Sequence, residues 1–178
     1  MKVQKMSQIA HKQRGVTLME LIASLAVMSV IVVGAVALYG SASSSEMSTT
    51  MSKDLNAIQA ATKQIFNGQG TYGASGTNLN NILVTAKKIP TTIAVDTTAT
   101  PNTLTHRNNG TVTVASTGSS FTIALTQIPV DVCIPLMTNA SSWKAIEVTG
   151  GAVQTSFPIP PTTADTQCKL GTTMTFTN

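Results

Sequence analysis

The most apolar stretch of the chain lies close to its amino terminus. Residues 16–39 hold one charged side chain, Glu20, and the first proline of the chain is Pro90. A helix of 24 residues rises about 1.5 Å per residue and so reaches roughly 36 Å. This length exceeds the hydrocarbon core of a bilayer, which is about 30 Å thick. The pattern therefore predicts a transmembrane helix with a carboxylate near its start.

The helical pattern continues beyond this stretch but changes character. Over residues 40–66 mostly apolar positions recur every three or four residues, while Glu46 and Lys53 lie on the opposite side. The stripe consists of Met47, Met51, Leu55, Ile58, Thr62 and Ile65. We expect one continuous helix whose amphipathic second half packs on a globular head and ends at Asn67-Gly68, where glycine suits a C-cap.

Residues 67–178 carry the signals of an antiparallel sheet. Apolar and polar residues alternate over 111–114 and again over 121–125, and the polar run 116–120 between them is typical of a turn. These segments predict a β-hairpin, the clearest strand signal in the chain.

Other parts of the head have weaker patterns. A second hairpin is expected from residues 143–148 and 152–157, which flank Gly150-Gly151, and a last strand over 172–177. The remaining expectations are a short helix over 78–88 that ends with Lys87-Lys88, an edge strand or loop within 91–109, a short helix starting near Pro135, and an extended loop over 158–161.

The net charge of +4 is unevenly distributed. Four basic residues lie within residues 1–15, which contain no acid, and the rest of the chain holds seven basic and seven acidic residues (11 − 4 = 7 basic). A basic leader on a neutral body does not indicate a nucleic-acid partner. Positive charge before a membrane segment keeps that side in the cytoplasm, so the chain after Tyr39 is expected to face outward.

The chain has two cysteines, Cys133 and Cys168. An even number of cysteines on the outer side of a membrane segment favours a disulfide, although two cysteines also occur as inert thiols in a protein core. A bridge would bound the region 133–168 and stabilise the fold by roughly 3.5 to 4 kcal/mol in the chain-entropy model. The expected fold class is α+β: a long N-terminal helix packed on an antiparallel β-sheet head with a C-terminal disulfide-bounded region.

Three interpretations of the amino-terminal segment are open. A cleaved signal peptide is favoured by the A-x-A sequence Ala35-Val36-Ala37, but the apolar run is longer than usual and contains Glu20. An uncleaved signal anchor accounts for the length but not for Gly15 or for Glu20, because a carboxylate in a spanning helix costs about 2.5–3.5 kcal/mol. The third interpretation is cleavage between Gly15 and Val16.

The third interpretation rests on a family resemblance. Gly15 followed by Val16-Thr17-Leu18-Met19-Glu20-Leu21 resembles the processing motif of type IV prepilins, which secretion pseudopilins share. The resemblance implies a cleaved leader over residues 1–15, N-methylation of Val16, and a role for Glu20 in subunit docking. Val16 in place of the phenylalanine of the best-known pilins resembles the type IVb subclass.

The same resemblance implies a function, partners and locations. The expected product is the major subunit of a surface filament used for adhesion, aggregation or conjugative contact. Its expected partners are copies of itself, a prepilin peptidase, an assembly ATPase with its inner-membrane platform, and an outer-membrane secretin. The subunit would sit in the inner membrane with its head in the periplasm before assembly. A minor pilin or pseudopilin, and an anchored periplasmic binding domain that does not polymerise, are the alternatives.

Candidate catalytic chemistry is sparse. His106, beside Arg107, is expected to be a solvated loop residue and not a metal ligand, and Trp143 is expected to fill the core. The acidic residues of the head are far apart in sequence, and no phosphate loop, nucleophile elbow or C-x-x-C motif occurs. The sequence therefore predicts neither an enzyme nor a cofactor.

Overall fold

The computed structural model describes residues 17–178, apart from the side chain of Ala37. Two compact units divide the chain at residues 41 and 42, and helix α1, Leu18–Ile65, contributes to both. In the first unit the described residues form the apolar half of this helix. The second unit, residues 42–178, is the head. The prediction of one continuous helix through residues 40–45 is confirmed, because the serine-rich run there is helical.

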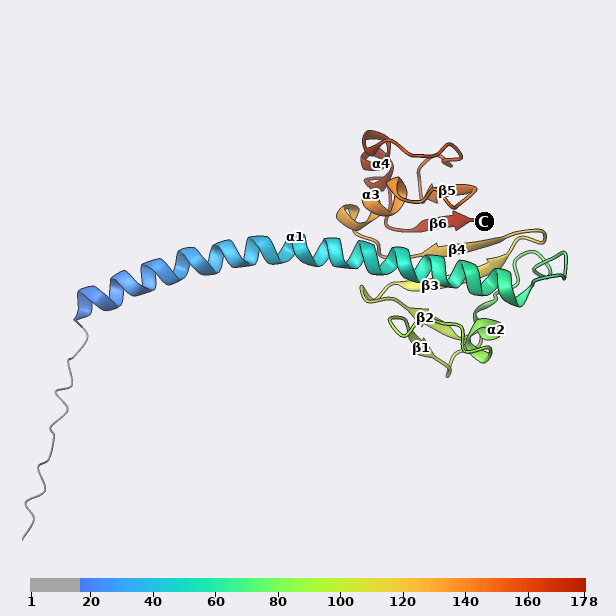
Figure 1. Cartoon of the computed structure of the whole chain (residues 1–178), viewed down its shortest axis with the longest axis horizontal. Helices are drawn as coiled ribbons and strands as arrows, with labels where there is room; N and C mark the ends of the chain where they lie inside the picture. Colours follow the sequence, from blue (N-terminus) through green and yellow to red (C-terminus); the bar gives the residue numbers. More distant parts are fainter. Residues whose placement is uncertain (1–16) are drawn as a thin grey trace, which may run out of the picture. The chain divides into compact units, whose positions relative to one another are not determined.

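The head is built on one antiparallel sheet, over which residues 42–65 of α1 lie (Figure 1). Its six strands run in the order β1-β2-β3-β4-β6-β5, and every neighbouring pair is antiparallel. The strands are β1 Ala94–Asp96, β2 Thr103–Thr105, β3 Thr111–Ser116, β4 Phe121–Leu125, β5 Ala145–Val148 and β6 Met174–Thr177.

The stripe on α1 forms one side of the head's core. Met51, Leu55, Ile58 and Thr62 are at most 5% exposed, and Met47 and Ile65 pack against the core at its margins. The hydroxyl of Thr62 donates to the carbonyl of Ile58 within the helix, so this buried polar group has a partner. The predicted amphipathic face is therefore confirmed.

The predicted hairpin is present as β3 and β4. Ser116 pairs with Phe121 at its closed end, and Gly118 in the turn has a φ of +91°, a conformation that glycine adopts without steric cost. Burial alternates along β4 as the sequence pattern requires, with Phe121, Ile123 and Leu125 buried. This local pairing forms the middle of the sheet.

The predicted second hairpin is wrong. β5 pairs along its length with β6, and the segment after Gly150-Gly151 contributes only a single bridge between Ile146 and Gln154. The backbone N–H of Ala152 donates to the side chain of Gln167 instead of to a strand. The chain therefore leaves the sheet after one bridge.

The short helices differ from expectation in their limits. α2 covers only Asn80–Thr85, and Lys87 follows it with a φ of +54°, so the two lysines are not its last turn. α3 spans Val130–Thr138 and contains Pro135, instead of starting there. α4, Pro161–Cys168, was not predicted. Pro161 occupies its first turn, where the missing N–H of proline costs no helical hydrogen bond.

A disulfide joins Cys133 of α3 to Cys168 of α4, with a Cα–Cα distance of 5.9 Å. The bridge bounds the region 133–168 as predicted and fixes α3 against α4 beside strands β5 and β6. Trp143 is 5% exposed and its ring centroid lies 5.3 Å from that of Phe176, which confirms its place in the core.

Candidate assembly site

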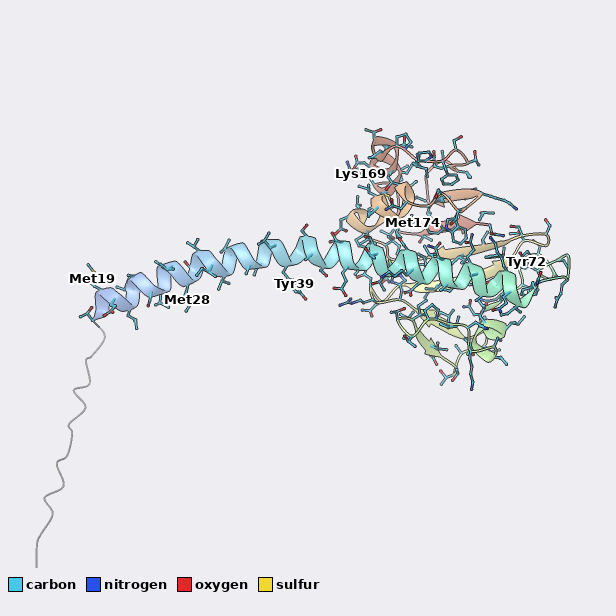
Figure 2. All side chains as sticks on the ribbon, viewed as in Figure 1. Met19, Met28, Tyr39, Tyr72, Lys169 and Met174 are labelled. Carbon is cyan, nitrogen blue, oxygen red and sulfur yellow. A yellow bond between two sulfur atoms is a disulfide. The ribbon has the colours of Figure 1, made fainter. Side chains whose placement is uncertain are left out.

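The apolar half of α1 is exposed along its whole length. Every side chain described between Leu18 and Tyr39 is exposed, and Met19, Met28 and Tyr39 project from the ribbon in Figure 2. By length and composition, this helix is the one among the described residues that is suited to span a membrane. An apolar surface that surrounds a helix on all sides requires an apolar environment, either lipid or other helices.

The two serine hydroxyls inside this segment are satisfied within the helix. The hydroxyl of Ser24 donates to the carbonyl of Leu21 at 2.9 Å, and that of Ser29 donates to Ala26 at 2.7 Å. An unpaired hydroxyl is costly in lipid. Both serines are therefore compatible with an apolar environment.

Thr17 caps the start of the helix. Its hydroxyl oxygen accepts a hydrogen bond from the N–H of Glu20 at 3.3 Å, and its carbonyl accepts from the same N–H at 3.0 Å. Sequence reasoning missed this cap, although Thr-x-x-Glu is the spacing of a capping box. Glu20 itself lies exposed in the first turn, where the helix dipole favours a negative charge.

The residues of the predicted processing site are only partly described. Gly15 and Val16 lie outside the described residues, and Glu20 lies at the start of α1 in the first unit. Cys133 and Cys168 are brought together in the head, where their role is to join two helices.

The prediction that His106 is a solvated residue is wrong, because this side chain is 4% exposed. Its Nε2–H donates to the carbonyl of Thr126 at 2.8 Å, and its Nδ1 accepts from the N–H of Asn108 at 3.2 Å. Burial lowers the pKa of His106, and the bond to Thr126 partly offsets this effect. The ring packs directly against Gly110, where a side chain would collide with it.

Next to His106 the head has a recess of about 270 Å³ beside α1. Met47, Thr50 and Met51 of α1 line it. At its outer edge Arg107 binds Glu46 at 2.6 Å. A single water molecule needs roughly 10–15 Å³ of such volume, so the recess is much larger than a site for one water.

Asp54 also lines the recess and accepts a hydrogen bond of 2.6 Å from the hydroxyl of Thr92. Desolvation by burial raises the pKa of Asp54, and the hydrogen bond from Thr92 opposes this rise. Within residues 17–178 no group of three His, Cys, Asp or Glu side chains is placed to hold a metal ion. The recess is therefore a mainly apolar hollow edged by charged side chains.

Comparison with known families decides the identity of the chain. The family model described as PilS N terminal matches residues 44–178, and the prokaryotic N-terminal methylation motif matches residues 10–36. The chain belongs to the PilS family of type IV pilins. The second match takes in the end of the expected leader from residue 10 together with Gly15, Val16 and Glu20, so it falls on the motif singled out in the sequence.

Two solved pilin structures share the fold of this pilin. A type IVb pilin from Salmonella typhi is 19% identical, with a TM-score of 0.59 over 72% of this chain and 97% of that one. TcpA, a type IV pilin from the Vibrio cholerae El Tor biotype, is 20% identical, with a TM-score of 0.51 over 75% of this chain and 99% of that one. No curated protein sequence matches the pilin. The α+β fold predicted for a pilin is thus confirmed.

Proposed function

We propose that this pilin is the major subunit of a type IVb-like filament, cleaved between Gly15 and Val16 and N-methylated on Val16. The observation that carries the proposal is the exposed apolar helix from Leu18 to Tyr39, which has a single charged residue, Glu20, in its first turn. Pilins are structural subunits, and the family and fold of this chain are non-enzymatic.

The exposed apolar surface of the helix suits two successive environments, the membrane before assembly and the filament after it. Before assembly lipid covers it, and in the filament the helices of neighbouring subunits replace the lipid. Both are apolar, so transfer between them changes the free energy of the helix far less than exposure to water would. The inner membrane would hold the subunit, with its head in the periplasm, until it joins an extracellular filament.

Glu20 sets the axial register between the helices of neighbouring subunits. A lone carboxylate in this helix costs about 2.5–3.5 kcal/mol on insertion scales. Cleavage before Val16 creates an α-amino group, and that ammonium on one subunit compensates Glu20 of the next. The pairing fixes the axial position of one helix against another, because a shifted helix leaves both charges unpaired.

The motif also supports a set of partners. Processing requires a prepilin peptidase, and filament growth requires an assembly ATPase, an inner-membrane platform and an outer-membrane secretin. Adhesion, aggregation and conjugative contact are the uses that we propose for the filament.

Shearing of intact cells tests the proposal. We expect thin filaments that consist mainly of this protein, and amino-terminal sequencing should begin at methylated Val16. Glu20→Val should leave cleavage unchanged and abolish filaments. Glu147→Val, at an exposed position of β5, is the matched control and should assemble normally. A mature chain that begins at Leu38 would contradict cleavage at Gly15. Sparse short filaments would indicate a minor pilin or pseudopilin, and a protein that stays membrane-bound and monomeric would contradict the filament function.

A further inference from the structure

The recess described above has the character of a contact surface. Its lining includes Met51, which is buried, and the half-buried Met47 and Thr50. Methionine side chains adapt readily to the shape of an inserted apolar group. The recess carries two acidic side chains, Glu46 and Asp54, against one basic side chain, Arg107.

A second surface of the head has the opposite features. We define the α2 patch as Ile82, Ala86, Lys87 and Lys88, all of which are exposed. Ile82 is 42% exposed, whereas its neighbour Leu83 is 1% exposed and belongs to the core. In the described part of the chain the ion pairs join other residues, so Lys87 and Lys88 have no acidic partner there.

The two surfaces lie in different parts of the head. In Figure 1 α2 lies toward the end of the sheet where α1 terminates, whereas residues 46–54 of α1 lie toward the end where the helix reaches the sheet. One copy of the chain therefore presents an exposed apolar patch beside two cations, and elsewhere an apolar recess with one more acidic than basic side chain. Repeating assemblies with helical symmetry require such a pair of different, complementary surfaces on every subunit.

We propose that the α2 patch of one subunit docks in the recess of a second copy, with Ile82 against Met47 and Met51. Lys87 and Lys88 then face Asp54 and the carboxylate of Glu46, which Arg107 of the same head already binds. The apolar contact removes Ile82 from water, and the opposite charges select this orientation over others. The inference rests on the proposed filament function, and it adds a contact between heads to the packing of the exposed helices.

Cross-linking in assembled filaments tests this contact directly. The native cysteines are bonded to each other, so a full-length chain with Thr50→Cys on α1 and Ile82→Cys on α2 carries two new thiols, one on each proposed surface. Oxidation or a short bismaleimide should then produce a ladder of multimers. The control pair, Thr50→Cys with the exposed Val153→Cys, should give no ladder.

The outcomes separate this inference from the filament function. A ladder that forms in filaments, and is lost when Glu20→Val prevents assembly, supports the contact. Filaments in which both thiols react with a monofunctional maleimide but form no ladder would overturn the contact and leave the filament function intact. Absence of filaments from the unmodified chain would instead overturn the filament function.

Charge reversal provides a second measurement that requires no new thiol. Lys87→Glu with Lys88→Glu places like charges against the acidic recess, and we expect about tenfold less sheared pilin, or lower still. Lys63→Glu with Lys144→Glu changes the net charge equally at two exposed positions outside the α2 patch. Normal filaments from this control support the proposal, whereas equal yields from the two double variants would contradict it.

Discussion

The side-chain oxygen of Asn80 accepts a hydrogen bond of 3.0 Å from the backbone N–H of Val114, which joins α2 to the middle of the sheet. The amide nitrogen of Asn80 donates to the carbonyls of Asn102 and Val112, at 3.1 and 3.2 Å. Asn80 is 2% exposed, and each of these three bonds connects segments that are distant in sequence. One buried amide therefore helps to hold α2 against the sheet, together with the backbone bond from Leu79 to Val114 and the buried side chain of Leu83.

Asn80→Asp should destabilise the head strongly. The substitution keeps the shape of the side chain but directs a carboxylate toward two carbonyl oxygens, which leaves buried acceptors without donors. We expect a loss of about 3 kcal/mol or more in the free energy of unfolding. Urea unfolding of the detergent-solubilised chain measures it, with Asn56→Asp at an exposed position of α1 as the control. Equal midpoints for the two variants would contradict this role.

The disulfide should contribute a large part of the stability of the head. Cys133 and Cys168 are separated by 35 residues, and closing a loop of this length contributes about 3.5 to 4 kcal/mol in the chain-entropy model. Cys133→Ser with Cys168→Ser should lower the free energy of unfolding by about that amount. A reductant should destabilise the unmodified protein similarly and leave the double variant unchanged. A reductant effect on both proteins would show that the effect does not arise from this bridge.

Two isoleucines of the head should respond differently to truncation. Ile58 on α1 is 1% exposed, so Ile58→Ala removes buried surface and leaves a cavity, at a cost of about 2–5 kcal/mol. Ile82 on α2 is 42% exposed, so Ile82→Ala should change stability by no more than about 0.5 kcal/mol. Thermal unfolding compares them. A large loss in the second variant would show that Ile82 supports the head itself.

Local patterns predicted the parts of the fold that depend on nearby residues. The stripe from Met47 to Ile65 follows the helical period and faces the core. Both strands of the β3–β4 hairpin and their turn lie within residues 111–125. A short stretch of sequence therefore contains both the alternation of apolar and polar residues and the turn that joins the two strands. The cysteines were paired correctly, because only two are present.

Long-range pairing was beyond the same reasoning. β5 adjoins β6 through contacts such as Ile146 with Phe176, thirty residues along the chain. The segment after Gly150-Gly151 has the alternation of a strand, but the side chain of Gln167 binds its backbone at Ala152. Nothing in the local sequence indicates that competitor.

The recess and the buried histidine show the same limit. The recess combines residues 46–54 with Thr92, His106 and Arg107, which no sequence spacing connects. One available signal was Asn109-Gly110, a dipeptide typical of turns. Asn109 has a φ of +59°, and the turn folds His106 inward against Gly110.

His106 should make the stability of the head depend on pH. As the neutral Nε2–H tautomer, its ring donates to Thr126 and accepts from Asn108, and protonation would place an N–H at Nδ1 against the N–H of Asn108. The pKa of His106 is lowered in the folded state, so the unfolded chain binds the proton first. The stabilisation is complete above the unfolded pKa of about 6.5 and is lost as pH falls from there through the folded pKa.

The slope of stability against pH measures this effect, and for one proton it stays below about 1.4 kcal/mol per pH unit. His106→Gln should be less stable at pH 7.5 but should lack the decline below pH 6.5. Asp54 lines the same recess, and its raised pKa gives a slope of opposite sign at lower pH. The comparison of the unmodified protein with His106→Gln is therefore repeated with Asp54→Asn added to each. The other charged groups of the recess, Glu46 and Arg107, are bound to each other and are the same in all four proteins. An identical decline in chains with and without His106 would assign the pH dependence to other groups.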